Sequence, residues 1–155
     1  MPLNLKDKVP DFHLQDQHNK EFRLSDFKGQ KVLLSFHPLA WTSVCKKQMK
    51  ALENNFDKFT DMNTVPVGLS VDHVPTKHAW SKNMGLKQLR ILADFWPHGQ
   101  VARNFDIFRE VEGFSERANV IIDENGNIEF IKIYNLPELP DLKEILEYLN
   151  KSSQG

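Results

Sequence analysis

The chain has 155 residues, of which 40% are hydrophobic and 26% charged, and it carries a formal net charge of −1 with a pI near 6.6. This length and balance are typical of one soluble globular domain, here residues 1–155, with room for one sizeable core. A charge so close to neutral gives no reason to expect nucleic acid or an acidic membrane as the main partner.

The N-terminal segment, the apolar runs and the cysteine content indicate the cellular compartment. Residues 1–12 (MPLNLKDKVPDF) contain no long apolar core and no small-residue cleavage site, which argues against a secretory signal. The longest apolar runs, such as residues 32–36, are too short to cross a bilayer. The single cysteine, Cys45, cannot form an internal disulfide. We therefore expect a cytoplasmic, reducing setting.

Periodicity predicts the first elements of the chain. A weak apolar–polar alternation over residues 11–22, interrupted by polar residues at 17–19, predicts an N-terminal β-hairpin. The apolar run at 31–37 follows a turn and precedes a proline, which is typical of a buried central strand. Beyond it, one apolar stripe predicts a single helix of roughly 18 residues. Its members are Met49, Leu52, Phe56 and Phe59.

The rest of the chain alternates between strands and helices. Strands are predicted at 64–71, 89–92, 118–123 and 128–134, and helices at 76–84, at 99–105 and around 142–149. Pro66 interrupts the first of these strands, and Asn125-Gly126 is a strong hairpin signal between the last two. The order predicts an α/β fold in which a central mixed β-sheet is flanked by helices. It matches a thioredoxin-like core with an N-terminal β-hairpin extension.

The most informative segment surrounds Cys45, which lies in the first turn of the long predicted helix. Free N–H groups and the positive end of the helix dipole favour an anion there, and the thiolate is the nucleophilic form of cysteine. If the turn is helical, Thr42 projects to the same face, and if Thr42 is the N-cap, its hydroxyl lies nearest the Cys45 amide. Both arrangements bring a hydroxyl close to the sulfur. Pro38 has no N–H and would limit the access of water to the Cys45 sulfur.

Each of these residues also has an ordinary structural explanation. A lone intracellular cysteine is often an inert small hydrophobe, and a threonine before a helix is usually only a cap. A proline between a strand and a helix usually just directs the chain. The combination of all three at this spacing favours a reactive cysteine.

The spacing Pro38-x-x-x-Thr42-x-x-Cys45 after an apolar strand resembles the active-site signature of the peroxiredoxin family, in its alkyl hydroperoxide reductase and thiol-specific antioxidant branch. Val-Pro-Asp-Phe at 9–12, Ala79-Trp80 and the stretch 94–97 resemble other family segments, as does Arg117 at the start of a late strand. The similarity extends over residues 9–149.

The resemblance implies specific roles. Cys45 would be the nucleophile that attacks the O–O bond of hydrogen peroxide or an organic hydroperoxide and becomes a sulfenic acid. Arg117 would hold the thiolate and orient the peroxide, because it stays charged and offers a planar set of donors. Thr42 would hydrogen-bond to the peroxide oxygens and Pro38 would shield the pocket. Gln48, which would brace the arginine, and Val44 are expected to line the binding site.

Some positions depart from the family pattern. Position 50, where a second, resolving cysteine would come five residues after Cys45, holds Lys50, so the chain resembles a 1-Cys form. Recycling then requires an external thiol: a thioredoxin, a glutaredoxin-like protein or a small thiol. His37 stands where the family has tyrosine or phenylalanine, and it is either a core partner or a residue that tunes the site. Relatives often form dimers, so we expect a homodimer.

No other chemistry is indicated. The histidines show no metal-ligand spacing, there is no glycine-rich phosphate loop, and no cofactor is expected. A second hypothesis is a thioredoxin-fold redox sensor or binding module that signals through oxidation of Cys45. A disulfide reductase is disfavoured because that chemistry normally uses Cys-x-x-Cys, and the matching positions here are Thr42 and Cys45.

Overall fold

The computed structural model describes residues 3–154, and side chains for residues 3–152. Within them, seven strands form the main sheet in the order β2-β1-β5-β4-β3-β8-β9. The strands are β1 His13–Gln15, β2 Glu21–Arg23, β3 Lys31–Phe36, β4 Thr64–Ser70, β5 Arg90–Ala93, β8 Arg117–Ile122 and β9 Ile128–Tyr134. The helices are α1 Ser43–Asn54, α2 Phe56–Asp61, α3 Val74–Met84, α4 Gln100–Asn104 and α5 Leu142–Gln154.

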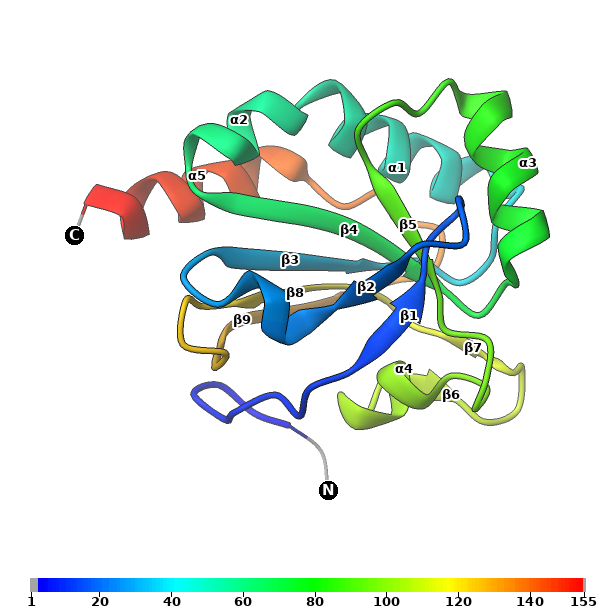
Figure 1. Ribbon diagram of the computed structural model, residues 1–155, viewed down its shortest axis with the longest axis horizontal. Helices are drawn as coiled ribbons and strands as arrows, with labels where there is room; N and C mark the ends of the chain where they lie inside the picture. The colour runs from blue at the N-terminus through cyan, green and yellow to red at the C-terminus, as the bar shows by residue number, and fades with distance from the viewer. Residues whose placement is uncertain (1–2, 155) are drawn as a thin grey trace.

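The sheet is mixed. β3 pairs in parallel with β4, and β4 in parallel with β5, whereas β8 and β9 continue the sheet antiparallel beyond β3. The hairpin of β1 and β2 extends the other side. Helices α1, α2, α3 and α5 lie on one side of the sheet and α4 lies on the other (Figure 1). The expected α/β fold with a mixed central sheet and an N-terminal hairpin is confirmed.

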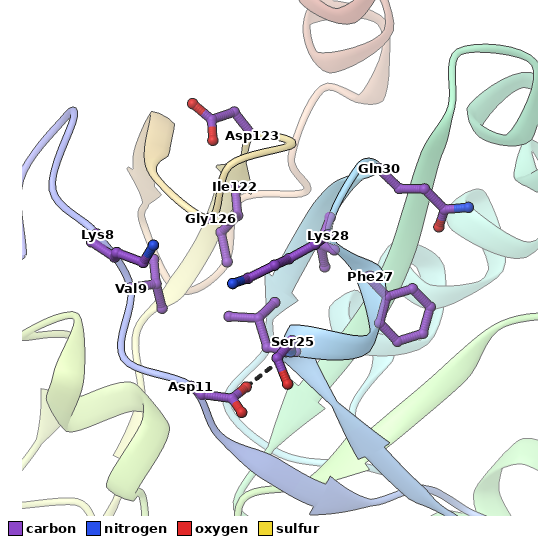
Figure 2. A pocket seen from close by; sticks show the side chains of 12 residues that line it. Lys8, Val9, Asp11, Ser25, Phe27, Lys28, Gln30, Ile122, Asp123 and Gly126 are labelled. Atoms are coloured by element: carbon purple, nitrogen blue, oxygen red, sulfur yellow. Dashed lines mark hydrogen bonds between the residues drawn. The ribbon is translucent and has the colours of Figure 1, made fainter.

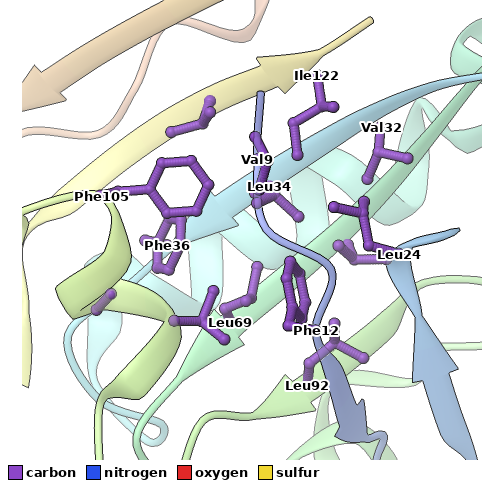
Figure 3. Packing of buried hydrophobic residues seen from close by; sticks show 14 of the residues in the cluster. Val9, Phe12, Leu24, Val32, Leu34, Phe36, Leu69, Leu92, Phe105 and Ile122 are labelled. Atoms are coloured by element: carbon purple, nitrogen blue, oxygen red, sulfur yellow. The ribbon is translucent and has the colours of Figure 1, made fainter. Parts of the chain in front are cut away.

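The central strand β3 is buried along its whole length because both faces of the sheet are covered. Val32, Leu34 and Phe36 point to the cluster beneath α4, where Phe105 and the N-terminal segment cover them (Figure 3). The Leu33 side chain points to the opposite face of the sheet, where it packs against α1, α2, α3 and α5. Each such side chain contributes roughly 1.5–3 kcal/mol by leaving water. The central strand therefore fixes the position of the loop that follows it.

The long predicted helix is in fact two helices, so that prediction was wrong. The apolar stripe is present, but helix α1 ends at Asn54 and α2 begins at Phe56. Between them, Asn55 adopts φ −111° and ψ 14°, and its side-chain amide donates to the Ala51 carbonyl at 2.8 Å. That bond offers the backbone an alternative to a continuous helix.

Smaller differences have local causes. Helix α3 begins two residues earlier than expected, because Pro75 fits the first turn of a helix. Pro66 does not interrupt β4 but lies inside it, opposite Leu33. A short 3-10 helix at Leu24–Phe27 and a small hairpin of β6 Phe108–Arg109 with β7 Phe114–Ser115 gave no clear sequence signal.

The topology gathers several chain segments at one edge of the sheet. The carboxyl ends of the parallel strands β3, β4 and β5 meet there, and the antiparallel strand β8 starts at the same edge, since Phe36 pairs with Ala118. Open α/β sheets place their sites at this edge. Helix α1 begins at this edge too, and α3 lies close to it (Figure 1).

Candidate active site

Cys45 occupies the first turn of α1, as the sequence predicts. Thr42 is the N-cap by its backbone, with φ −108° and ψ 151°, so that Ser43, Val44 and Cys45 are the first three helical residues. The Lys46 amide donates to the Thr42 carbonyl at 2.9 Å and closes this turn. The sulfur therefore lies at the positive end of the helix dipole, where an anion is stabilised.

Arg117 brings its guanidinium to the sulfur from 72 residues away in sequence. Its Nη1 donates to Cys45 Sγ at 3.3 Å and to Gln48 Oε1 at 2.6 Å, and its Nε donates to the Leu136 carbonyl at 2.8 Å. The side chain is 3% exposed. A buried guanidinium is stable only with such partners, and these three contacts fix its plane beside the sulfur.

Gln48 connects this arginine to the central strand. It lies three residues after Cys45, on the same face of α1. Its Nε2 donates to the Ser35 hydroxyl at 2.7 Å and to the Phe36 carbonyl at 3.2 Å. Because both donor directions face β3, the amide oxygen is left to accept from Arg117. The contact between Gln48 and Arg117 that the sequence predicts is present.

The Thr42 side chain differs from the expectation. Within residues 3–154 it makes no capping bond to α1; instead its hydroxyl donates to the Leu39 carbonyl at 2.9 Å. Of the two arrangements that the sequence leaves open, Thr42 is the N-cap by its backbone, but its hydroxyl bonds within the loop and does not cap the Cys45 amide. Thr42 is exposed, Val44 is half-buried, and Pro38 is buried immediately after β3. Within the described residues, the Thr42 hydroxyl makes its hydrogen bond to the Leu39 carbonyl and not to Cys45 Sγ.

The sulfur is more enclosed than expected for a reactive cysteine. Cys45 is 0% exposed and belongs to the apolar cluster between the sheet and the helices. Its polar contact is the guanidinium of Arg117. In the loop that leads into α1, Trp41, Thr42 and Ser43 are exposed. Because the sulfur is closed to solvent, a peroxide can reach it only after a local displacement of the residues around it.

Two buried polar side chains lie near the site: His37, which the sequence marks as a core partner or a residue that tunes the site, and Lys77, which was not predicted. Lys77 and His37 are each 0% exposed, and burial together with the charge of Lys77 holds the pKa of His37 well below its usual range. His37 is thus neutral, and its ring lies 5.4 Å from that of Trp80. One signal was available for Lys77: it precedes Trp80 by three residues and Met84 by seven, on the buried face of α3.

A separate hollow lies far from Cys45. It measures about 270 Å³ and is lined at the other end of β3 by Val9, Leu24 and Val32, among others. The amino groups of Lys8 and Lys28 point toward one another across it (Figure 2). Since β3 runs from this hollow to the cysteine loop, the two regions are separated by the length of the strand.

The described residues form no metal centre and no membrane-spanning helix. Among the described residues, no group of three or more His, Cys, Asp or Glu side chains is arranged to hold a metal ion. None of the helices in the described part of the chain is long and apolar enough to span a bilayer.

Comparison with known proteins agrees with this geometry. The sequence profile of the AhpC/TSA family matches residues 5–131. The chain belongs to the peroxiredoxin (AhpC/TSA) family. It is similar to "Alkyl hydroperoxide reductase E" of Mycobacterium tuberculosis, with 33% identity over 140 residues, 90% of this chain and 91% of that protein. Similarity extends to "Thioredoxin-dependent peroxide reductase, mitochondrial" of Drosophila melanogaster, 30% identical over 156 residues, which cover 95% of this chain and 66% of that protein.

Solved peroxiredoxins share the fold. The reduced 2-Cys peroxiredoxin of Plasmodium vivax superposes with a TM-score of 0.91 at 28% identity, covering 99% of this chain and 83% of that one. AhpC of Enterococcus faecalis superposes with a TM-score of 0.87 at 24% identity, covering 98% and 93%, which shows the fold alone. This peroxiredoxin has a single cysteine, Cys45, in agreement with a 1-Cys form.

Proposed function

We propose that this peroxiredoxin is a thiol-dependent peroxidase in which Cys45 reduces hydrogen peroxide or organic hydroperoxides. The observation that carries the proposal is the 3.3 Å contact between Arg117 Nη1 and Cys45 Sγ at the start of α1. Family membership and the names of the similar proteins support the same chemistry.

The reaction is a displacement at oxygen. The Cys45 thiolate attacks the nearer peroxide oxygen, a new S–O bond forms, and the O–O bond breaks. The sulfur becomes a sulfenic acid, and the leaving oxygen takes a proton and departs as water or an alcohol. Negative charge moves from sulfur to the leaving oxygen in the transition state, and the guanidinium of Arg117 is already in place to stabilise both.

The loop residues would bind the peroxide. Because the Thr42 hydroxyl proton is directed to the Leu39 carbonyl, its oxygen is left as an acceptor for the O–H of the substrate. Pro38 is buried and would exclude water from the sulfur, and half-buried Val44 would give the pocket an apolar wall. Gln48 would keep Arg117 in position through the contact at 2.6 Å.

The sulfenic acid must be reduced by another molecule, since the sequence holds no second cysteine. An external thiol would attack the sulfenic sulfur, release water and form a mixed disulfide, and a second thiol would then regenerate Cys45. We assign this reductant to the class of thioredoxins, glutaredoxin-like proteins or small thiols. The name of the Drosophila melanogaster relative supports the first of these.

We further propose a homodimer that acts in the cytoplasm. Trp41, Phe95 and Trp96 are large aromatic side chains that are 53%, 40% and 80% exposed, and such surfaces are enriched at protein contacts. A reducing compartment supplies the thiols that recycling needs. Analytical ultracentrifugation tests the dimer, and cell fractionation tests the compartment.

Steady-state turnover tests the proposed function. Peroxide consumption is followed with each thiol reductant in turn, for the wild type and for Cys45→Ser. The proposal requires turnover with at least one reductant and none in the variant. Equal consumption by both proteins contradicts it. Negligible turnover, together with a partner captured by a mixed disulfide at Cys45, favours a redox sensor instead.

A further inference from the structure

Lys77 is a fully buried lysine that the proposed mechanism leaves unused. It is 0% exposed and lies on the inner face of α3, beside Trp80. Lysine is almost never fully buried unless its charge is paired, because removal of an ammonium from water is costly. The position of Lys77 at the edge of the sheet that holds Cys45 therefore calls for a specific partner.

Lys77 finds its partner in Ser70, the first member of a relay of hydrogen bonds that ends in the loop before Cys45. Lys77 Nζ donates to Ser70 Oγ at 2.5 Å, and Ser70 Oγ donates to Asp72 Oδ2 at 2.6 Å. The same carboxylate oxygen accepts the backbone N–H of Ala40 at 2.8 Å. Because the single hydroxyl proton of Ser70 is given to Asp72, its lone pair is free for the ammonium. Lys77 is thus linked to the backbone just ahead of Cys45.

The loop needs this anchor, since its backbone is strained. Trp41 adopts a left-handed conformation, with φ 67°, although it is bulky and 53% exposed. Such residues persist only where the surrounding structure holds them. The Ala40 amide bonded to Asp72 and the Thr42 hydroxyl bonded to Leu39 are the contacts that hold the two sides of Trp41.

The charges around Lys77 connect it to the sulfur as well. It faces Asp72 after β4, Asp94 after β5, neutral His37 after β3 and Cys45 on α1. Burial lowers the pKa of Lys77 to about 8, whereas Asp72, Asp94 and Cys45 act in the opposite direction. Electrostatic coupling is reciprocal, so a Cys45 thiolate that favours the Lys77 ammonium is favoured by it in return.

We propose that Lys77 is a positioning residue for Cys45, which anchors the loop 38–42 through Ser70 and Asp72 and adds a buried positive charge to that of Arg117. The proposal rests on the proposed peroxidase function for its catalytic consequence. Its effect on the sulfur itself is independent of peroxide. This separates the two ideas experimentally.

The test compares Lys77→Met, which keeps the length of the stem and removes the charge, with Lys82→Met on the exposed face of the same helix. Alkylation of Cys45 by iodoacetamide is measured from pH 5 to 10, together with single-turnover oxidation by hydrogen peroxide. For Lys77→Met we expect the alkylation midpoint to move up by about half a pH unit or more and peroxide oxidation at pH 7 to slow about tenfold. Lys82→Met is expected to match the wild type.

Two further measurements separate the anchor from the charge. Ser70→Ala breaks the relay but retains the ammonium, so peroxide oxidation should slow while the alkylation midpoint stays. In the wild type, peroxide oxidation should decline above about pH 8, where the pKa of Lys77 lies, because the ammonium loses its proton.

The proposal is overturned if Lys77→Met folds and has the same alkylation midpoint and the same peroxide oxidation rate as Lys82→Met. If Lys77→Met does not fold, a wild-type rate that stays flat from pH 7 to 10 overturns it. A wild type that fails to consume peroxide but shows the expected alkylation difference would contradict only the peroxidase function.

Discussion

Removal of the guanidinium at the sulfur is the perturbation whose effect the structure defines best. Arg117→Met keeps much of the side-chain volume and removes the donor at 3.3 Å from Cys45 Sγ. Two unit charges at that separation attract by about 5 kcal/mol at an effective dielectric of ~20, which is an upper limit. Loss of one preorganised donor to a developing anion costs about 3–4 kcal/mol. We therefore expect peroxide oxidation to slow about 10²- to 10³-fold.

The same substitution leaves two acceptors without their donor, the buried Gln48 Oε1 and the partly buried Leu136 carbonyl. Each is expected to cost about 1–3 kcal/mol of stability, so circular dichroism must first show that Arg117→Met is folded.

The assay is stopped-flow tryptophan fluorescence under single-turnover conditions at pH 7. Arg23→Met, on the exposed N-terminal hairpin, is the matched control and should react like the wild type. Arg117→Lys keeps a charge without the planar set of donors, so its oxidation rate should fall between those of the wild type and Arg117→Met. A folded Arg117→Met that is slowed less than about fivefold, roughly 1 kcal/mol, would refute the reasoning.

Three further predictions concern the support of the site. Gln48→Leu removes the brace on Arg117 and should slow peroxide oxidation about tenfold while Cys45 alkylation is retained; an unchanged oxidation rate contradicts the brace. Burial lowers the pKa of Lys77 to about 8 from 10.5, so the folded state binds fewer protons between these values and the free energy of unfolding should rise with pH there, by up to about 3 kcal/mol. Urea denaturation of Cys45→Ser with and without Lys77→Met at pH 7.5 and 10 measures this, and an equal pH dependence rejects it. Leu33→Ala should lower the free energy of unfolding by about 2–5 kcal/mol in the same assay, and a loss below about 1 kcal/mol would show that β3 does not centre the core.

Local sequence signals predicted the position of Cys45. A short apolar strand, a proline and a helix start are signals within eleven residues, and they predict Cys45 in the first turn of a helix, where the structure has it. The apolar run of β3 and the Asn-Gly hairpin likewise predicted the centre and one edge of the sheet. These features depend on nearest neighbours along the chain.

Long-range features needed more than periodicity. Arg117 lies 72 residues from Cys45, and family resemblance rather than spacing singled it out. Helical spacing places Lys77 on the same face of α3 as Trp80 and Met84, but its complete burial depends on the approach of α3 to the ends of β4 and β5, which spacing does not specify. The sequence leaves the partner of the Thr42 hydroxyl open, because the choice between a cap bond and the Leu39 carbonyl depends on the conformation of a short loop.

Mass spectrometry of the oxidised thiol tests the central claim most directly. The protein is mixed with one equivalent of hydrogen peroxide, the sulfenic acid is trapped with dimedone, and the peptides are sequenced. The account predicts that the adduct forms on Cys45 within seconds and that Arg117→Met forms it far more slowly. Cys45 that stays unmodified while peroxide persists, or while methionines take up the oxygen, would contradict it.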